Sequence, residues 1–158
     1  MKLNGKIEID GSYKLENLIP ACAQWGLNSN ISISKSENYG GTQVNFDRYI
    51  YNYGNVFSIN NGRIYCSRHA IIQVDYVLNV PEAERSYYVL LGKNGFYQYV
   101  GGTGPNNGLS GSTLSGSFQF EINANEYITL MLGSPSTYSN KTIYNDSKIA
   151  VSVVRYLD

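Results

Sequence analysis

Apolar and polar residues alternate with a period of two along much of this chain, and no other feature limits its fold as strongly. Between Arg63 and Val80 almost every even position is apolar, and most odd positions are polar. The segments 114–122 and 148–157 repeat the pattern. A strand that buries one face in an antiparallel sheet has this period, whereas an amphipathic helix has a period of about 3.6 residues. No long run has the helical period, so the sequence predicts an all-β fold.

Turn signals divide this pattern into short strands. Asp10-Gly11 and Asn94-Gly95 are hairpin sequences that need positive φ angles, and Arg68-His69 is expected to split the 63–80 run into two strands. Residues 123–126 predict another turn. Polar or glycine-rich loops are expected at residues 36–42, 101–111 and 134–147. About eight to ten strands joined in this way predict an antiparallel two-sheet sandwich of the jelly-roll type.

Composition narrows the possible partners. The 158 residues fit one domain, and twelve Lys and Arg balance twelve Asp and Glu, so the charge gives no reason to expect nucleic acid as a partner. No stretch approaches the roughly 18 apolar residues of a transmembrane helix, and we expect no membrane insertion. Only 15% of the residues are charged, against about 25% in a typical soluble domain. A partner subunit is therefore expected to bury part of the surface.

The two cysteines, Cys22 and Cys66, are too few for a disulfide framework. Cys66 falls on the apolar face of its predicted strand, where a free cysteine packs as a small hydrophobe. A bridge between Cys22 and Cys66 is the alternative that the sequence leaves open.

Several short motifs follow one another in order between residue 31 and the end of the chain. A Val-x-Phe-Asp sequence at 44–47 is followed by Asn-x-Gly at 52–54. The later motifs are Gly62-x-Ile64-x-Cys66, the LGKNG sequence at 91–95, and the LSG sequence at 114–116 that precedes Phe118, Phe120 and Ile122. In this order the motifs resemble the globular head of the complement-one-q family, which shares a trimeric jelly roll with the tumour-necrosis-factor-like proteins.

Three segments depart from the family pattern. Residues 70–72 stand where the family has Gly-x-Tyr, and residues 149–153 replace its Phe-x-Gly-x-Leu. Asn125-Glu126 replaces the Gly-Asp of a tight turn. This last exchange is mild, because asparagine also tolerates the left-handed conformation that glycine would supply.

The resemblance implies a homotrimeric binding head whose last strand and its neighbours pack near the threefold axis. We assign residues 29–158 to this head. Residues 1–28 lie outside the resemblance and are expected to form a short β appendage or docking segment. Some heads of this family bind calcium, which makes Asp47, Asn145 and Asp146 candidate oxygen ligands, although no calcium-loop spacing is present.

Residues for catalysis are few, and we expect neither enzymatic activity nor a cofactor. His69 is the only histidine, so a metal site with two histidine ligands cannot form within one subunit. Two alternatives to a structural role are a Ser-His-Asp arrangement and a metal or anion site where three copies of His69 meet on a threefold axis. A glycan-degrading site would need two acids about 5 to 10 Å apart. The candidate acids are Asp75, Glu82, Glu84, Glu121 and Glu126.

Fifteen tyrosines are the remaining chemical theme. Tyrosine rings can stack on sugars or anchor a protein interface. Residues 49, 51 and 53 form one tyrosine row, and residues 97 and 99 form another. The preferred interpretation places one row in the core and the other in the trimer interface. If there is a ligand site, exposed loops should contribute to it, and the candidate residues are Tyr97, Tyr99, Asn106, Asn107, Tyr138 and Asn140.

The amino-terminal sequence MKLNGKIEIDGS has no apolar core of a secretory signal. Together with the resemblance, this favours a phage virion protein, such as a tail-fibre tip, a receptor-binding protein or a head fibre. Its expected partners are a host-surface glycan or protein receptor, and other virion proteins contacted through the amino-terminal segment. The alternatives are a secreted or surface-displayed bacterial head of the spore-surface type, and a glycan-degrading enzyme with a site between subunits.

Overall fold

The computed structural model describes residues 21–33, 41–82, 87–103, 110–133 and 141–158. Every regular element among them is a strand, and none of them forms a helix of the length and apolarity needed to cross a membrane. The strands are β1 (Cys22–Gly26), β2 (Ile31–Ile33), β3 (Thr42–Gln43), β4 (Arg48–Tyr53), β5 (Phe57–Asn60), β6 (Arg63–Cys66), β7 (Ala70–Glu82), β8 (Tyr87–Lys93), β9 (Phe96–Thr103), β10 (Ser110–Ile122), β11 (Tyr127–Gly133), β12 (Lys141–Ile143) and β13 (Lys148–Tyr156).

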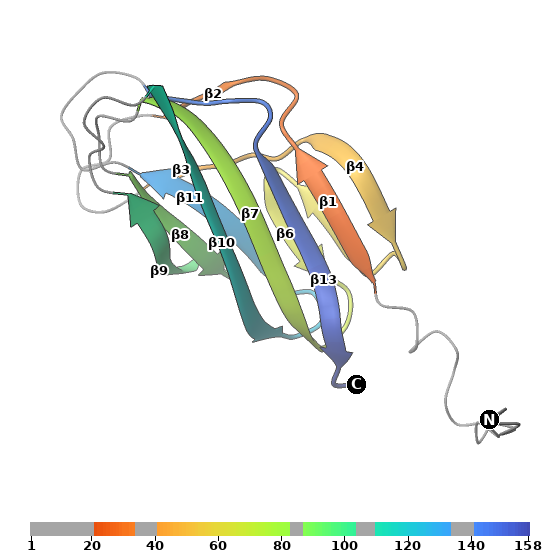
Figure 1. Cartoon of the computed structure of the whole chain (residues 1–158). Helices are drawn as coiled ribbons and strands as arrows, with labels where there is room; N and C mark the ends of the chain where they lie inside the picture. The colour runs from red at the N-terminus through yellow and green to blue at the C-terminus, as the bar shows by residue number, and fades with distance from the viewer. Residues whose placement is uncertain (1–20, 34–40, 83–86, 104–109, 134–140) are drawn as a thin grey trace, which may run out of the picture.

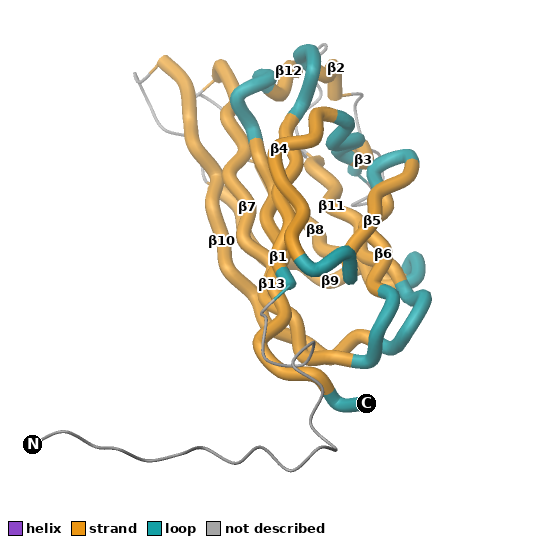
Figure 2. Tube along the Cα trace, turned by 90° about the vertical axis from the view of Figure 1, so that its right-hand side faces the viewer, coloured by secondary structure: helices purple, strands orange, loops and turns teal. Residues whose placement is uncertain are grey.

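Two sheets face each other as layers (Figures 1 and 2). The first sheet has the strand order β10-β7-β13-β1-β4, and the second has the order β5-β6-β11-β8-β9, with β3 paired to β11. The described strand pairs are antiparallel, and β2 pairs with β12 in a small separate ribbon. This architecture confirms the predicted all-β jelly-roll sandwich.

The core lies between the two layers, and the alternation predicts which residues enter it. In β7, Ile72, Val74 and Leu78 are almost fully buried, whereas Gln73 and Asp75 are only half-buried and point outward. The second sheet fills the opposite side of the core with Ile64, Val89, Ile128, Leu130 and Leu132. Because each sheet removes one apolar face from water, their mutual burial is the main force that holds the layers together.

The predicted turns within the described residues are confirmed, and the Asp10-Gly11 turn lies outside these residues. Asn94 and Gly95 have φ angles of 51° and 86° and form the two-residue turn between β8 and β9. Asn125, with a φ angle of 67°, turns the chain between β10 and β11, and its N–H donates to the Cys66 carbonyl at 2.7 Å. The asparagine supplies the left-handed conformation expected there. Residues 67–69 separate β6 from β7, as the Arg68-His69 pair predicted.

The predicted boundary at residue 28 needs correction. Strand β1 lies between β13 and β4 in the first sheet and pairs with both. Ala23, Trp25 and Leu27 are buried in the core, so the last part of the predicted appendage belongs to the sandwich. The sequence gives little sign of this strand, because it is short and Gln24 is the only polar residue that alternates with its inward side chains. Residues 1–20 lie outside the described residues, and their docking role stays a prediction.

Two loop predictions are also corrected. Strand β9 continues to Thr103 and β10 begins at Ser110, so both ends of the predicted 101–111 loop are strand. Within the predicted 134–147 loop, β12 pairs with β2. The alternation in β13 also shifts, because the register changes between Val153 and Arg155, so that Arg155 is exposed and Tyr156 packs against the core.

Both cysteines are free thiols in the structure. Cys66 is buried in the core, as predicted, and burial raises the pKa of its thiol. Cys22 lies on the outward face of β1, where its partner in β4 is Tyr53. The two thiols therefore belong to different sheets and point to different environments, which gives no support to the bridge between them.

Replacing Trp25 tests whether β1 belongs to the core. We expect Trp25→Ala to lower the free energy of unfolding by about 3–5 kcal/mol, because a large buried side chain is removed. Urea denaturation followed by circular dichroism at a fixed protein concentration measures this change. Ser58→Ala, at an exposed position of β5 in the second sheet, is the control and should change the free energy by less than about 0.5 kcal/mol. An unchanged midpoint for Trp25→Ala would contradict the assignment of β1 to the core.

Candidate functional site

The outer face of the second sheet carries tyrosines from three strands. Tyr65 on β6 and Tyr127 on β11 are direct cross-strand partners, and their ring centroids lie 5.4 Å apart. On β9, Tyr97 pairs with Gly92 of β8, and a side chain at Gly92 would collide with the Tyr97 ring. The absence of a side chain at Gly92 therefore lets this ring lie flat over β8. These tyrosines are far apart in the sequence, and only the strand register reveals that they share a face.

Two turns at one end of this face are tied together. The Glu126 carboxylate accepts the backbone N–H of Asn123 and the Nδ2 of Asn94, both at 2.8 Å, and its Oε2 lies 3.6 Å from Nζ of Lys93. The Asn94 side chain also accepts the N–H of Tyr127 at 3.0 Å. These bonds fix the β8–β9 turn against the β10–β11 turn, and thereby hold Tyr127 in place.

The structure describes two of the predicted ligand residues. Tyr97 is 44% exposed at the start of β9, and the Tyr99 backbone pairs with Leu90 on β8. The residues Asn106, Asn107, Tyr138 and Asn140 lie outside the described residues, and their role stays a prediction. The described part of β9 ends at Thr103, opposite Tyr87, and β11 ends at Gly133, opposite Tyr88. The six residue steps from Tyr97 to Thr103 correspond to about 20 Å of extended strand.

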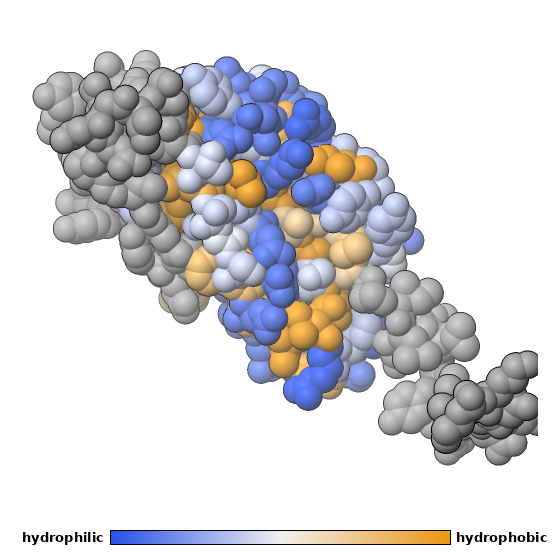
Figure 3. Space-filling model, viewed as in Figure 1, coloured by the Kyte–Doolittle hydropathy of each residue, from blue (hydrophilic) through white to orange (hydrophobic). Residues whose placement is uncertain are grey.

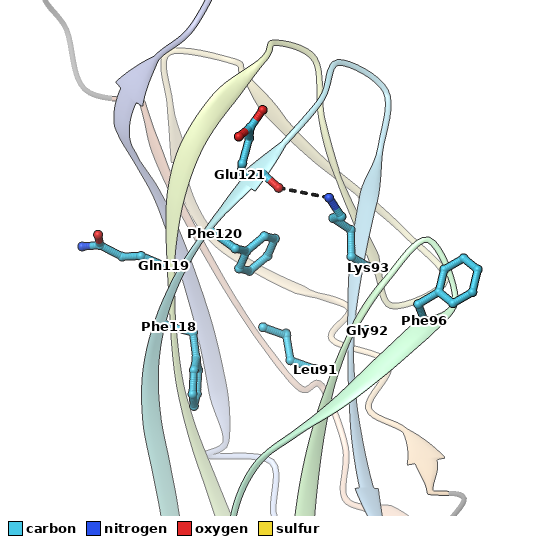
Figure 4. Close-up of a pocket in the computed structure, with 8 residues that line it drawn as sticks. All are labelled: Leu91, Gly92, Lys93, Phe96, Phe118, Gln119, Phe120 and Glu121. Carbon is cyan, nitrogen blue, oxygen red and sulfur yellow. Dashed lines mark hydrogen bonds between the residues drawn. The ribbon is translucent and has the colours of Figure 1, made fainter.

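A hollow of about 330 Å³ opens between the sheets where β9 and β10 form an edge of the sandwich (Figure 4). Leu91 and Phe120 point toward each other inside it, and Phe96 lies at the rim with 84% of its surface exposed. Nζ of Lys93 donates to the backbone oxygen of Glu121 at 3.2 Å and links the two sheets there. Phe118 and Phe120 share the lining with Lys93, Gln119 and Glu121, so the hollow suits an apolar side chain that is flanked by polar groups.

The middle of the outer face of the first sheet carries two registered rows, which we call the first-sheet face. The outward rows next to them are charged, with Arg48 and Lys148 on one side and Glu121 and Arg155 on the other. One row contains Tyr53, Cys22, Ser152, Gln73 and Gln119, and the other contains Tyr51, Gln24, Ala150, Asp75 and Ser117. Asp75 is the only Asp, Glu, Lys or Arg in either row, and its carboxylate accepts the Gln73 amide at 3.1 Å. Figure 3 views this side of the molecule and shows pale and apolar residues on both sides of a hydrophilic band.

The tyrosine row on β4 is exposed, which corrects one prediction. Tyr49 and Tyr53 are each 64% exposed, and the rings of Tyr51 and Tyr53 stack with centroids 5.5 Å apart. Burial is the main cause that raises the pKa of the Tyr51 hydroxyl. Tyr97 of the second row is also exposed, so the described tyrosines of the two rows do not supply the core as the preferred interpretation expected.

The candidate catalytic histidine and two of the candidate calcium ligands have other partners among the described residues. Nε2 of His69 lies 2.7 Å from Oε1 of Glu121, and no serine hydroxyl bonds to this ring in the part of the chain described. Oδ1 of Asp47 accepts the N–H of Asn28 at 2.8 Å, and the Asn145 carbonyl accepts the Arg48 guanidinium at 3.3 Å. Within the described ranges, no group of three or more His, Cys, Asp or Glu residues could hold a metal ion.

Comparison with known proteins places the fold. No family model and no curated protein matches the chain. Eiger TNF from S. frugiperda superposes with a TM-score of 0.65 at 7% identity, over 89% of this chain and 94% of that one. Murine APRIL superposes with a TM-score of 0.65 at 8% sequence identity, over 86% of this chain and 100% of that one. The globular domain of zebrafish complement 1qA protein superposes with a TM-score of 0.60 at 10% identity, over 87% of this chain and 98% of that one. At such identities the likeness establishes a fold of the TNF and complement 1q type.

Replacing Glu126 tests the tied turns and their dependence on pH. Hydrogen bonds, above all from the N–H of Asn123, hold the pKa of Glu126 below its usual range. Such a carboxylate stabilises the fold above the unfolded-state pKa of about 4.3, and this contribution is lost as the pH falls through the lowered pKa. We therefore expect Glu126→Gln to reduce the free energy of unfolding by about 1 kcal/mol at pH 7 and by much less near pH 3.

Urea denaturation at both pH values measures this difference. Asp146→Asn is the matched control, because Asp146 is exposed and accepts no hydrogen bond from the described residues. An equal loss of stability at both pH values for Glu126→Gln would show that the carboxylate charge is not what ties the turns.

Proposed function

We propose that this chain is a non-enzymatic binding head that acts as a homotrimer. The observation that carries the proposal is the first-sheet face, where Asp75 is the only fully charged side chain in two rows that cross the whole sheet. Interface centres are depleted in charged residues, because an unpaired charge is costly to remove from water. A second copy of the chain can cover this face at little electrostatic cost.

The two edges of the molecule support a ring-like assembly. The β9–β10 edge carries the hollow and the exposed Phe96, while β4 at the other edge of the first sheet carries the exposed Tyr49 and Tyr53. Two different surfaces that contact each other form a heterologous interface, and such interfaces close into rings when the rotation allows it. The resemblance to complement-one-q heads favours closure at three subunits.

For the biological setting, we propose a phage virion, with the head as a tail-fibre tip, receptor-binding protein or head fibre. The partner would be a host-surface glycan or protein, contacted by Tyr97, Tyr99 and the segments that contain Asn106, Asn107, Tyr138 and Asn140. A secreted or spore-surface bacterial head would use the same fold. The neighbouring genes separate the two settings, since capsid or tail genes indicate a virion and collagen-like repeats upstream indicate a surface protein.

The oligomeric state is the direct test of the assembly. Sedimentation equilibrium is expected to give about three times the 17.6 kDa of one chain. Ala150→Arg places a charge in the middle of the first-sheet face and should yield monomers, because the interface would have to bury that charge. Ser58→Arg, at an exposed position of the second sheet, is the control and should remain trimeric. A wild-type chain that sediments as a stable monomer would refute the proposal.

Binding to cells tests the recognition role separately. The labelled trimer is expected to bind host cells or their wall glycans in a saturable manner, without releasing new reducing ends from polysaccharides. The absence of binding to every plausible host would refute recognition and leave an architectural role in the particle. Release of reducing ends or unsaturated sugars would show that the head is an enzyme.

A further inference from the structure

A polar groove of about 300 Å³ opens on the outer face of the second sheet, at the hairpin between β5 and β6. Its lining consists of Gln43, Asn45, Asn60, Asn61, Arg63 and Tyr65. Carboxamides dominate this lining, and each can both donate and accept hydrogen bonds. No Asp or Glu lines the groove, so its one formal charge is the positive charge of Arg63.

The floor of the groove is held by the chain itself. Nε2 of Gln43 donates to Oδ1 of Asn45 at 2.6 Å and to the carbonyl of Asn61 at 2.5 Å. Asn61 and Gly62 adopt positive φ angles of 49° and 68° in the hairpin turn. A Cβ at Gly62 would collide with the Asn45 side-chain oxygen and lie 2.7 Å from Nε2 of Gln43. The turn and the β3 segment therefore fit closely, and the groove is shaped before any ligand enters.

The Arg63 guanidinium is held by aromatic groups and not by an acid. It lies 4.9 Å from the centroid of the Tyr127 ring, and a side-chain hydrogen bond with Tyr65 is the main cause that raises its pKa. Among the described residues, no carboxylate lies within ion-pair distance of Arg63, whereas Arg68 is paired with Asp158 at 2.6 Å. Arg63 thus presents an uncompensated cation at the groove.

We infer that this groove binds a sugar residue that carries a carboxylate, as uronic acids and sialic acids do. A guanidinium presents a fork of N–H donors that matches a carboxylate in a bidentate arrangement. The carboxamides suit sugar hydroxyls, and the Tyr65 ring offers a face on which a sugar ring can stack. The inference deepens the proposed recognition of a host surface, on which it rests for its biological role, by naming the ligand class and a site away from the first-sheet face.

The test is an NMR titration of the full chain, labelled with ¹⁵N, with glucuronic acid, N-acetylneuraminic acid, glucose and acetate. We expect at least one of the two acid sugars to shift the amide signals of Asn60, Asn61 and Arg63, with glucose and acetate binding about tenfold more weakly or not at all. The acid sugar with the lower Kd identifies the ligand source. If glucose bound as tightly as the acid sugars, the role of the carboxylate would be refuted. If acetate bound as tightly, the groove would be a site for small anions, and the inference of a sugar ligand would be refuted.

Substitutions locate the interaction. Arg63→Gln is expected to weaken binding of the acid sugar by about tenfold, and Arg63→Lys by less, because lysine keeps the charge but loses the fork. Arg155→Gln, at an exposed arginine on β13, is the matched control and should bind as the wild type does. If Arg63→Gln does not fold by circular dichroism, Asn60→Ala takes its place with the same expectation.

The outcomes separate this inference from the proposed function. Absence of shifts with both acid sugars, or shifts confined to residues outside the groove, would overturn the inference whatever the oligomeric state. Binding of an acid sugar by a chain that sediments as a monomer and ignores host cells would support the groove and refute the trimeric head.

Discussion

The burial of one face of each sheet against the other is the constraint on which the rest of the molecule depends. Side chains of a strand alternate between its two faces, so the inward position of Ile72 and Val74 sends Gln73 and Asp75 outward. A slip of one residue would carry polar groups into the core, which makes the register costly to change. The register that the core enforces also brings Tyr65 beside Tyr127 on the outer face, although no apolar contact within the core involves these two rings.

The two outer faces differ in chemistry, and the difference indicates what each can do. The first-sheet face is made mostly of small or uncharged side chains, which a protein partner can cover without removing many charges from water. The second sheet exposes Arg63 among carboxamides, and burying this cation against an apolar surface would be unfavourable. A polar ligand can instead keep its hydrogen bonds satisfied. These opposite costs are the physical basis for proposing assembly through one face and recognition through the other.

The sequence predicts what is local and misses what depends on pairing. The Asn94-Gly95 turn and the strand of β7 could be predicted, because positive φ angles and a long period of two leave clear local signals. Strand β1 was assigned outside the head, because five residues carry too short a pattern and its place between β13 and β4 is set by non-local pairing. The register shift near Val154 coincides with a break in the alternation at Val154-Arg155, but the size and direction of the shift depend on the pairing with β7. Tyr97 could be named as a candidate from the sequence. Tyr65 and Tyr127 could not, because only the strand pairing shows that they lie on the same sheet face.

Assembly through the first-sheet face would raise the overall binding affinity of the groove on the second sheet. A single polar groove of about 300 Å³ has room for little more than one or two sugar residues, and such contacts are weak on their own. Because the Gln43 amide and the Asn61–Gly62 turn already fix the floor, little ordering of the protein opposes binding. The trimer proposed above would carry three such grooves. Where two of them reach the same glycan-coated surface, simultaneous binding would raise the overall affinity without any new contact, so that a weak site on each subunit would suffice for attachment.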